Sequence, residues 1–228
     1  MIGLRVAVIL SVKAFVEPYS KGMCSRYSRN KGQVKVGKTK VAIKAPPQAI
    51  IRPTDRASVI RKGSGGLEEA NLRWGLIPSW AKDPKIGVQC INARAETISE
   101  KPSFREAFQK RRCLVPADGF WEWKTIGKKK IPWKFARPDS EEFCMAGLWE
   151  SWMDEGKPLE TFTIITTSPN GLVSPVHDRM PVILTPEAGE AWLEKGGVGC
   201  LKAIEDDFLV KTCEVKPDRA DDQTELNF

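Results

Sequence analysis

The chain has 228 residues, of which 41% are hydrophobic, enough for a sizeable buried core and for one large domain. Its 36 Lys and Arg residues exceed its 29 Asp and Glu residues, and the net charge of +7 favours a polyanionic partner such as nucleic acid without establishing one. No apolar run approaches the roughly 20 residues of a membrane span. The cysteines form no closely spaced pair of the kind that binds zinc: Cys24, Cys90, Cys113, Cys144, Cys200 and Cys213. We therefore expect no membrane, no metal and no other cofactor, with free thiols in a reducing cytoplasm.

The first 22 residues differ from the rest of the chain. Met1 to Leu10 is apolar enough to suggest a signal peptide, but Lys13 and Glu17 interrupt the run and no small-residue cleavage site follows. A start codon assigned upstream of a true start at Met23 explains the same facts, and a leader removed by a protease is the alternative. We expect residues 1–22 to be a mis-assigned or removed extension and residues 23–228 to form the domain.

Short strands and turns are predicted for the first half of this domain. Residues 33–61 are basic and rich in Pro, Val and Ile, and residues 63–66 are predicted as a flexible loop. A helix is predicted from Ser103 to about Arg112, because Ser103 and Glu106 have the spacing of a capping box.

The centre of the chain is predicted to form two strands, residues 113–115 and 120–124, joined by a turn over residues 116–119. Side chains alternate between the faces of a strand. Phe120, Glu122 and Lys124 are therefore expected on one face of the second strand. Trp121 and Trp123 are expected on the other face, where they can anchor a core.

The remaining chain is predicted to contain five more strands and one helix. The helix spans residues 186–195, with Thr185 at its start and two glycines at its end. The strands are expected at residues 131–136, 143–149, 162–167, 181–184 and 209–215. Mostly strands with a few helices indicate an α+β fold, a single domain built on a curved mixed sheet or partly closed β-barrel with a few flanking helices.

Two side chains have acid–base chemistry that suits catalysis. His177 is the only histidine and lies in a loop just before an apolar strand, where a proton-transfer role and a simple surface position are both open. Glu122 stands between two tryptophans, which can desolvate the carboxyl group and raise its pKa into the range useful for general acid or base catalysis. An outward-facing, solvated glutamate is the alternative.

Cys24 follows Met23, so translation from Met23 and loss of that methionine would leave an N-terminal cysteine. Such a residue has an α-amine with a pKa of about 8 beside a thiol with a pKa of about 8.5, so both nucleophiles are available near neutral pH. With an aldehyde, the amine forms a Schiff base and the thiol then closes a five-membered thiazolidine ring. An internal Cys24 cannot do this, and an ordinary buried or solvated cysteine is the alternative.

Five motifs follow one another along the chain: Met23-Cys24-Ser25-Arg26-Tyr27, Arg73-Trp-Gly-Leu-Ile-Pro-Ser-Trp80, Asn92-Ala-Arg-Ala-Glu-Thr97, Arg112-Cys-Leu-Val-Pro-Ala-Asp-Gly-Phe-Trp-Glu-Trp-Lys124 and His177-Asp-Arg-Met-Pro-Val-Ile-Leu184. Together they resemble the SOS-response-associated peptidase (SRAP) family, and the resemblance covers the chain from Met23 to about Lys195. It implies a sensor that forms a thiazolidine crosslink with abasic sites in single-stranded DNA and so shields the lesion. The peptidase label of the family reflects self-removal of the initiator methionine.

The resemblance also implies a role for each reactive residue. Cys24 is the crosslinking residue, and Asn92 positions its backbone. Glu122 moves protons during imine formation and reversal, while His177 assists opening of the sugar to its aldehyde. The implied partner is single-stranded DNA that contains abasic sites, and we expect a monomer.

The same resemblance implies contacts with DNA. Arg26, Arg94 and Arg179 match positions where the family contacts phosphates, which fixes the register of the strand without reading its sequence. Thr166 is placed near the site. The alternative is that each arginine forms a surface ion pair.

Trp80 and Pro53 match positions where the family packs against bases next to the lesion, and aromatic stacking tolerates any base. The alternative is that Trp80 is a core residue. The run Lys128–Lys130 lies in a predicted hairpin turn, where a DNA contact and a solvated turn are both open.

The chain departs from the commonest family pattern at three places: at Ser25, where glycine is usual; at residues 52–55, where Ala-Pro-Thr-Gln is usual; and in the tail after Cys213. Two other functions remain open. A thiol hydrolase would use an internal Cys24 activated by His177, and it would tolerate residues 1–23. A non-covalent single-stranded nucleic-acid binder would keep its binding after Cys24→Ala.

Overall fold

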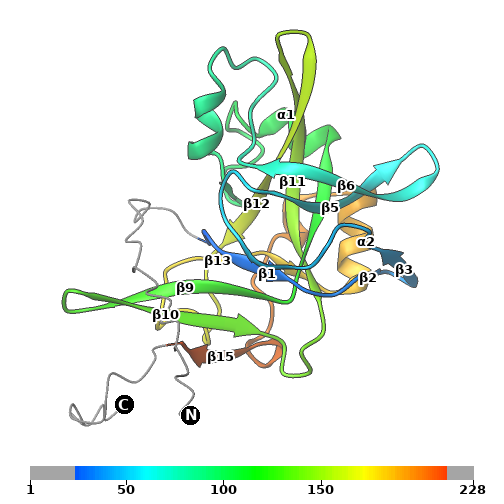
Figure 1. Cartoon of the computed structure of the whole chain (residues 1–228). Helices are drawn as coiled ribbons and strands as arrows, with labels where there is room; N and C mark the ends of the chain where they lie inside the picture. Colours follow the sequence, from blue (N-terminus) through cyan, green and yellow to red (C-terminus); the bar gives the residue numbers. More distant parts are fainter. Residues whose placement is uncertain (1–23, 215–228) are drawn as a thin grey trace, which may run out of the picture.

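The structure is a computed structural model that describes residues 24–214. The extension predicted over residues 1–22 lies outside the described residues, as does Val215 at the end of the last predicted strand. Most of the described chain is in strands, and the helices are few and short, so the predicted α+β fold is confirmed (Figure 1).

Five strands close into a barrel: β5 (Arg56–Gly63), β6 (Gly66–Trp74), β8 (Arg112–Ala117), β11 (Phe143–Asp154) and β12 (Lys157–Thr167). They pair in the ring β12, β6, β5, β8, β11 and back to β12. Gly63 and Gly66 pair at the ends of β5 and β6, so the predicted loop is shortened to the two residues between them. The partly closed barrel that the sequence predicted is therefore a closed one.

A second sheet has five strands in the order β15, β10, β9, β1 and β4. Its members are β1 (Tyr27–Arg29), β4 (Gln48–Ile51), β9 (Gly119–Ile126), β10 (Lys129–Ala136) and β15 (Val210–Cys213). The strand β8 leads directly into β9, so the chain passes from the barrel into this sheet. The smaller elements are β2 (Gln33–Val36), β3 (Thr39–Ala42), β7 (Asn92–Arg94), β13 (Met180–Pro181), β14 (Ile183–Leu184) and the 3-10 helices η1 (Pro84–Gln89), η2 (Val198–Cys200) and η3 (Asp206–Phe208).

Alternation along the barrel strands separates two hydrophobic cores. Cys113 and Val115 of β8 belong to the first core, whereas Leu114 between them belongs to the second. The first core also contains Phe120 and Phe135, whose rings stack 5.1 Å apart, so the five-stranded sheet packs on this side. The second core lies under the β2–β3 hairpin and α2 (Pro186–Glu194). Both faces of β8 and of the first half of β11 are thus buried, which explains the continuous apolar runs of these two strands.

The helix α2 has the predicted caps. The Thr185 side chain accepts a hydrogen bond from the Ala188 amide at 3.3 Å, and Pro186 occupies the first turn. Gly196 follows the helix with a φ of +62°, a conformation that favours glycine.

The helix α1 (Arg105–Lys110) is shorter than predicted, and the capping box is wrong. Phe104 is the N-cap residue, and no side chain caps the helix. The amides of Phe104 and Arg105 both donate to the Lys101 carbonyl, at 2.9 Å each. A backbone turn therefore starts the helix where the spacing of Ser103 and Glu106 predicted a side-chain cap.

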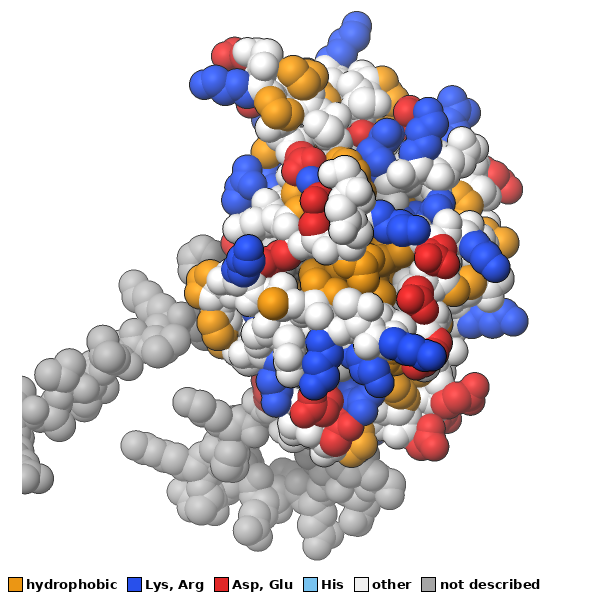
Figure 2. Space-filling view, turned by 90° about the vertical axis from the view of Figure 1, so that its right-hand side faces the viewer, with side chains coloured by type: hydrophobic (Ala, Val, Ile, Leu, Met, Phe, Trp, Pro, Cys, Tyr) orange, Lys and Arg blue, Asp and Glu red, His pale blue; other side chains and the backbone are white. Residues whose placement is uncertain are grey.

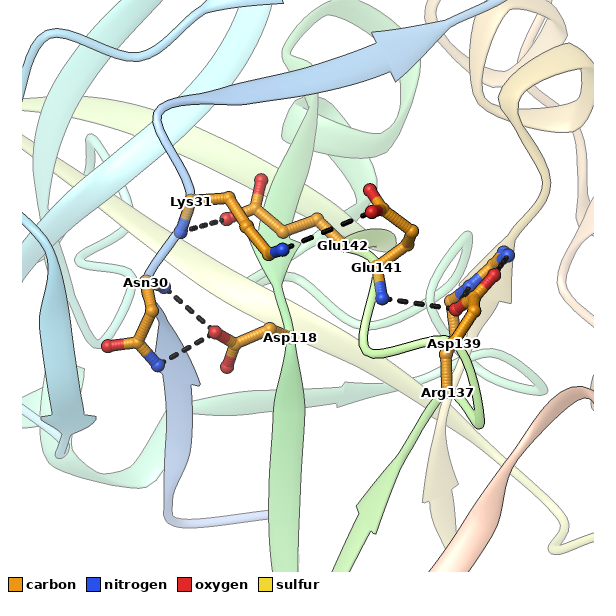
Figure 3. Close-up of polar contacts among 7 residues, drawn as sticks. All are labelled: Asn30, Lys31, Asp118, Arg137, Asp139, Glu141 and Glu142. Carbon is orange, nitrogen blue, oxygen red and sulfur yellow. Dashed lines mark hydrogen bonds and ion pairs between the residues drawn. The ribbon is translucent and has the colours of Figure 1, made fainter.

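The turn predicted over residues 116–119 is also wrong. β8 continues through Pro116, which pairs with Cys144 of β11, and only Asp118 separates β8 from β9. The chain bends here without reversing, because the two strands belong to different sheets. The Asp118 carboxylate accepts hydrogen bonds from the Asn30 amide at 2.9 Å and the Asn30 side chain at 2.7 Å (Figure 3). It therefore fastens the end of β1 to the start of β9.

Both faces of β9 are buried from Phe120 to Glu122. Phe120 packs in the first core, and Glu122 on the same face is 2% exposed. Trp121 lies under the ammonium group of Lys134, 4.9 Å from its ring centroid, and its indole N–H donates to Glu214 at 2.6 Å. Trp121 is therefore buried on its own face of the strand, as expected, but against charged side chains, whereas Glu122 lies on the face of the first core.

Candidate active site

Cys24 and Glu122 form the centre of the candidate site. The backbone nitrogen of Cys24 donates a 2.7 Å hydrogen bond to Oε1 of Glu122, although the two residues are 98 positions apart. The strand pairing explains the contact, because β1 runs antiparallel to β9 with Tyr27 opposite Phe120. The chain before β1 therefore follows β9 towards Glu122, and both residues are buried.

Burial controls the protonation of both groups. It raises the pKa of the Glu122 carboxyl group to about 8, the Cys24 amide lowers that pKa, and the Asp178 carboxylate raises it. Burial also raises the pKa of the Cys24 thiol well above its usual value, and the charge of Glu122 raises it further. Burial therefore opposes formation of the Cys24 thiolate in this chain, and it shifts the pKa of Glu122 in the direction that we predicted.

His177 lies on the other side of the same carboxyl group. Its Nε2 atom is 3.9 Å from Oε2 of Glu122, and its Nδ1 atom accepts a hydrogen bond from the Arg179 amide at 3.1 Å. In neutral His177 the proton is then on Nε2, facing Glu122. Asp178 is highly exposed and places a carboxylate oxygen 3.1 Å from Nδ1.

Arg179 is held in place by a network that the sequence did not reveal. Its two terminal nitrogens bond both carboxylate oxygens of Glu96, at 2.6 and 2.8 Å, and one also donates to the Thr166 carbonyl at 2.7 Å. Arg94 pairs with Thr166 where β7 runs parallel to β12, and its side chain is exposed. Arg179 can make the predicted contact with a phosphate only if the phosphate displaces the Glu96 carboxylate.

Arg26 lies over the ring of Trp123, with its guanidinium carbon 4.8 Å from the ring centroid. Trp123 is on the face of β9 opposite to that of Glu122, so this cation–π pair lies across the strand from the carboxyl group. Trp123 is half-buried there, against Arg26.

The remaining predicted site residues lie on the elements around this centre. Asn92 begins β7 and pairs with Ile164 of β12. Trp80 is 56% exposed, and its indole N–H donates to the Pro102 carbonyl at 3.3 Å, so it is not a core residue. Pro53 is half-buried in the loop before β5. Within residues 24–214, no hydrogen bond joins Trp80 or Pro53 to the Cys24 and Glu122 pair.

Residues 52–55 differ from the commonest family pattern, and hydrogen bonds hold the loop around Pro53. The Asp55 carboxylate accepts from the Arg52 amide at 2.8 Å. Thr54, which has a φ of +77°, donates its amide to the Trp74 carbonyl at 2.9 Å. The aspartate at this position therefore closes the turn on itself.

A separate groove lies between the β2–β3 hairpin, the β5–β6 hairpin and α2. Figure 2 shows this face, with apolar side chains at its centre and both basic and acidic side chains around them. The charged side chains that line the groove are Lys40, Lys44, Lys62, Glu68, Glu69, Glu190 and Glu194. Their mixed charge does not favour a polyanion, so this groove is no extension of the candidate site.

Two absences hold for residues 24–214. No helix there is long and apolar enough to cross a membrane. No group of three or more His, Cys, Asp and Glu side chains in that range is arranged to hold a metal ion.

The chain belongs to the SOS response associated peptidase (SRAP) family, whose model matches residues 23–214. It is similar to abasic site processing protein YoqW of Bacillus subtilis (strain 168), with 53% identity over 151 residues. That match covers 65% of this chain and 64% of the relative, so the chain spans less than two thirds of the length of that protein. Abasic site processing protein HMCES of Gallus gallus is 38% identical over 159 residues, which is 59% of this chain and 47% of that protein.

The fold is also similar to solved structures. A crystal structure of a protein from Bacteroides thetaiotaomicron superposes with a TM-score of 0.73 at 31% identity, covering 83% of this chain and 91% of that one. A second, from Bordetella bronchiseptica, has a TM-score of 0.73 at 27% identity and covers 85% of this chain and 100% of that one.

Proposed function

We propose that this protein captures abasic sites in single-stranded DNA by forming a thiazolidine crosslink through Cys24, once residues up to Met23 have been removed. The contact between the Cys24 backbone nitrogen and the buried Glu122 carboxyl group supports this proposal most directly. That nitrogen becomes the reactive amine when Cys24 is the first residue. The names of the relatives, abasic site processing proteins, support the same substrate.

The reaction has three steps, beginning with the ring-opened aldehyde of the abasic sugar. The α-amine of Cys24 adds to the aldehyde carbon and forms a carbinolamine. Neutral Glu122 then gives its proton to the departing hydroxyl group, so that water leaves and an iminium ion remains. The Cys24 sulfur finally adds to the iminium carbon, and the thiol proton returns to the Glu122 carboxylate.

The perturbed Glu122 suits both proton transfers. Because burial raises its pKa to about 8, the group is mostly neutral at physiological pH and can still release a proton. His177, with Nε2 facing the same carboxyl group, is placed to assist opening of the sugar ring. Arg26, Arg94 and Arg179 each lie two residues from a proposed reactive residue, and they supply phosphate contacts that carry no base specificity.

The backbone at Cys24 supports cleavage of the bond before it. Its φ of +36° lies in the left-handed region, which costs a non-glycine residue about 1–2 kcal/mol. This torsion no longer exists when Cys24 is the first residue, so removal of Met23 releases the strain. The adjacent Glu122 carboxyl group is the acid or base for that autoproteolytic step.

The thiol hydrolase is disfavoured by the same geometry. A hydrolase needs a Cys24 thiolate activated by His177, but burial raises the thiol pKa and His177 faces Glu122 and Asp178. A non-covalent binder has no use for the buried carboxyl group at the Cys24 nitrogen. The covalent trap accounts for both features.

The test uses protein whose first residue is shown to be Cys24 by intact mass. It is incubated with a single-stranded oligonucleotide that carries one abasic site and is analysed on a denaturing gel after heating. We expect a heat-stable band that Cys24→Ala abolishes and that Cys213→Ala, which alters an exposed thiol, retains. Protein that keeps residues 1–23 should give no band. An equal band from Cys24→Ala, or none from the authentic protein, would disprove the thiazolidine mechanism.

A further inference from the structure

The hairpin between β9 and β10 projects from the five-stranded sheet. We call residues 123–132 the basic hairpin. β1 pairs with β9 only at Gly119 and Phe120, and β15 pairs with β10 only from Trp133 to Ala136. No neighbouring strand therefore flanks the basic hairpin, and Figure 1 shows it extending away from the barrel.

The basic hairpin carries a concentrated positive charge. Lys124, Lys128 and Lys129 lie on it, and the sequence has no Asp or Glu between Glu122 and Asp139. None of these three lysines forms an ion pair with another described residue, and Lys128 and Lys129 are exposed. This is unlike the groove under the β2–β3 hairpin, where lysines and glutamates are mixed. The hairpin is therefore the better surface for a polyanion.

The charge is continuous with the candidate site. Lys124 and Ile126 share the face of β9 that carries Glu122, and pairing of Ile126 with Lys129 puts Lys129 on that face as well. At roughly 3.3 Å per residue, Lys124 lies about 7 Å and Lys129 about 13 Å along the strand from Glu122. A nucleic-acid strand that places its lesion at Cys24 thus meets a row of cations on one side.

We propose that the basic hairpin is a second DNA-binding surface, which holds the phosphates of the strand flanking the abasic site. This inference rests on the proposed function, since it places the lesion at Cys24. The lysines act as point charges on the backbone and contribute affinity for any flanking sequence. They lengthen the footprint of the protein on one side of the lesion only.

The test compares two triple variants, each of which replaces three lysines with uncharged glutamine. K124Q/K128Q/K129Q removes the charge of the basic hairpin, and K35Q/K38Q/K40Q removes the same charge from the exposed lysines of the β2–β3 hairpin. Binding to an undamaged single-stranded oligonucleotide is measured by fluorescence anisotropy over a range of salt concentrations. Each lost phosphate contact should reduce the slope of log K against log salt by about 0.7.

We expect the first set to reduce that slope by about 2 and to weaken binding roughly 10- to 100-fold at about 0.1 M salt, while the second set changes neither. K124R/K128R/K129R should restore the wild-type slope, because it keeps the charge. Equal effects of both glutamine sets, or none from the first, would show that the hairpin is only a solvated turn. Circular dichroism confirms that each variant is folded.

Crosslinking supplies the second readout. Two oligonucleotides of equal length carry the abasic site at the 5′ end or at the 3′ end. At limiting protein concentration, K124Q/K128Q/K129Q should slow crosslinking to one of these oligonucleotides and leave crosslinking to the other unchanged. Equal slowing of both would contradict a contact on one side. Because the salt slope is measured on undamaged DNA, it tests the hairpin even if crosslinking fails altogether, so failure of the proposed function is distinguishable from failure of this inference.

Discussion

Glu122→Gln should stabilise the protein while it impairs crosslinking. The pKa of the Glu122 carboxyl group is raised from the usual 4.5 to about 8, chiefly by burial. A raised pKa means that the folded state resists ionisation of this group, so ionisation favours unfolding. The penalty is absent below about pH 4, grows from about pH 4.5 to about pH 8, and is complete above that range. Glutamine has no such penalty.

The magnitude follows from the two pKa values. A difference of one unit is about 1.4 kcal/mol, so holding the carboxyl group protonated in the folded protein, when the unfolded chain ionises it, costs about 3 kcal/mol at neutral pH. Of this, less than 1 kcal/mol is present at about pH 5. The free energy of unfolding of Glu122→Gln should therefore exceed that of the wild type by an amount that increases by about 3 kcal/mol between about pH 5 and pH 8.

Urea unfolding of both proteins at several pH values over this interval measures the difference directly. Glu69→Gln alters a carboxyl group whose pKa is lowered, so its stability difference from the wild type should change with pH in the opposite direction. A stability difference between Glu122→Gln and the wild type that is constant with pH would refute the reasoning, because it would mean that Glu122 is already ionised at about pH 5. The same variant should crosslink abasic DNA more slowly, since glutamine cannot exchange a proton.

Three further predictions concern the neighbours of this carboxyl group. Cys24→Ser keeps the α-amine but not the thiol, so it should give a crosslink that survives heating only after borohydride reduction of the imine. Glu96→Gln removes the counter-ion of Arg179, so we expect a loss of about 1–3 kcal/mol in urea unfolding, and faster crosslinking because Arg179 no longer has to exchange that carboxylate for a phosphate. Asp118→Ala removes the acceptor of two Asn30 hydrogen bonds, and it should lower the free energy of unfolding by about 1–3 kcal/mol.

These three predictions have separate controls. Cys24→Ser without borohydride should leave no heat-stable band, and a stable band there would contradict the requirement for sulfur. Glu68→Gln changes an exposed carboxylate that also pairs with an arginine, Arg61, and it should leave crosslinking unchanged. For Asp118, destabilisation by Asp118→Ala equal to that of the exposed Asp154→Ala would contradict its role in fastening β1.

The fold class and the second helix were predictable because their signals are local. Thr185 and Pro186 specify the start of α2 within two residues. The capping box at Ser103 is equally local, yet it was wrong, because the Lys101 carbonyl had already organised the preceding turn. A side chain with the right spacing forms a cap only if the backbone leaves those amides available.

The contacts that build the site were not predictable from spacing. Cys24 and Glu122 are separated by 98 residues, and Arg179 and Glu96 by 83 residues. The resemblance to the family predicts Glu122 as a site residue, and the structure buries this residue for a reason other than the one expected. Flanking tryptophans were expected to desolvate it, whereas β9 turns the Glu122 face to the first core and buries Trp121 on the opposite face, against Lys134 and Glu214. Which face of a strand is inward depends on the sheets that enclose it.

The buried pair also determines the order of the proposed reaction. A thiol with a strongly raised pKa is a poor nucleophile, so the Cys24 amine must react with the aldehyde first. Formation of the iminium ion places a positive charge beside the sulfur and converts Glu122 to a carboxylate that can take the thiol proton. The burial that suppresses the thiolate before DNA binds therefore ceases to oppose the reaction once the imine exists. In the proposed reaction, a cysteine held in this way is protected from adventitious oxidation until its own backbone nitrogen has bound the lesion.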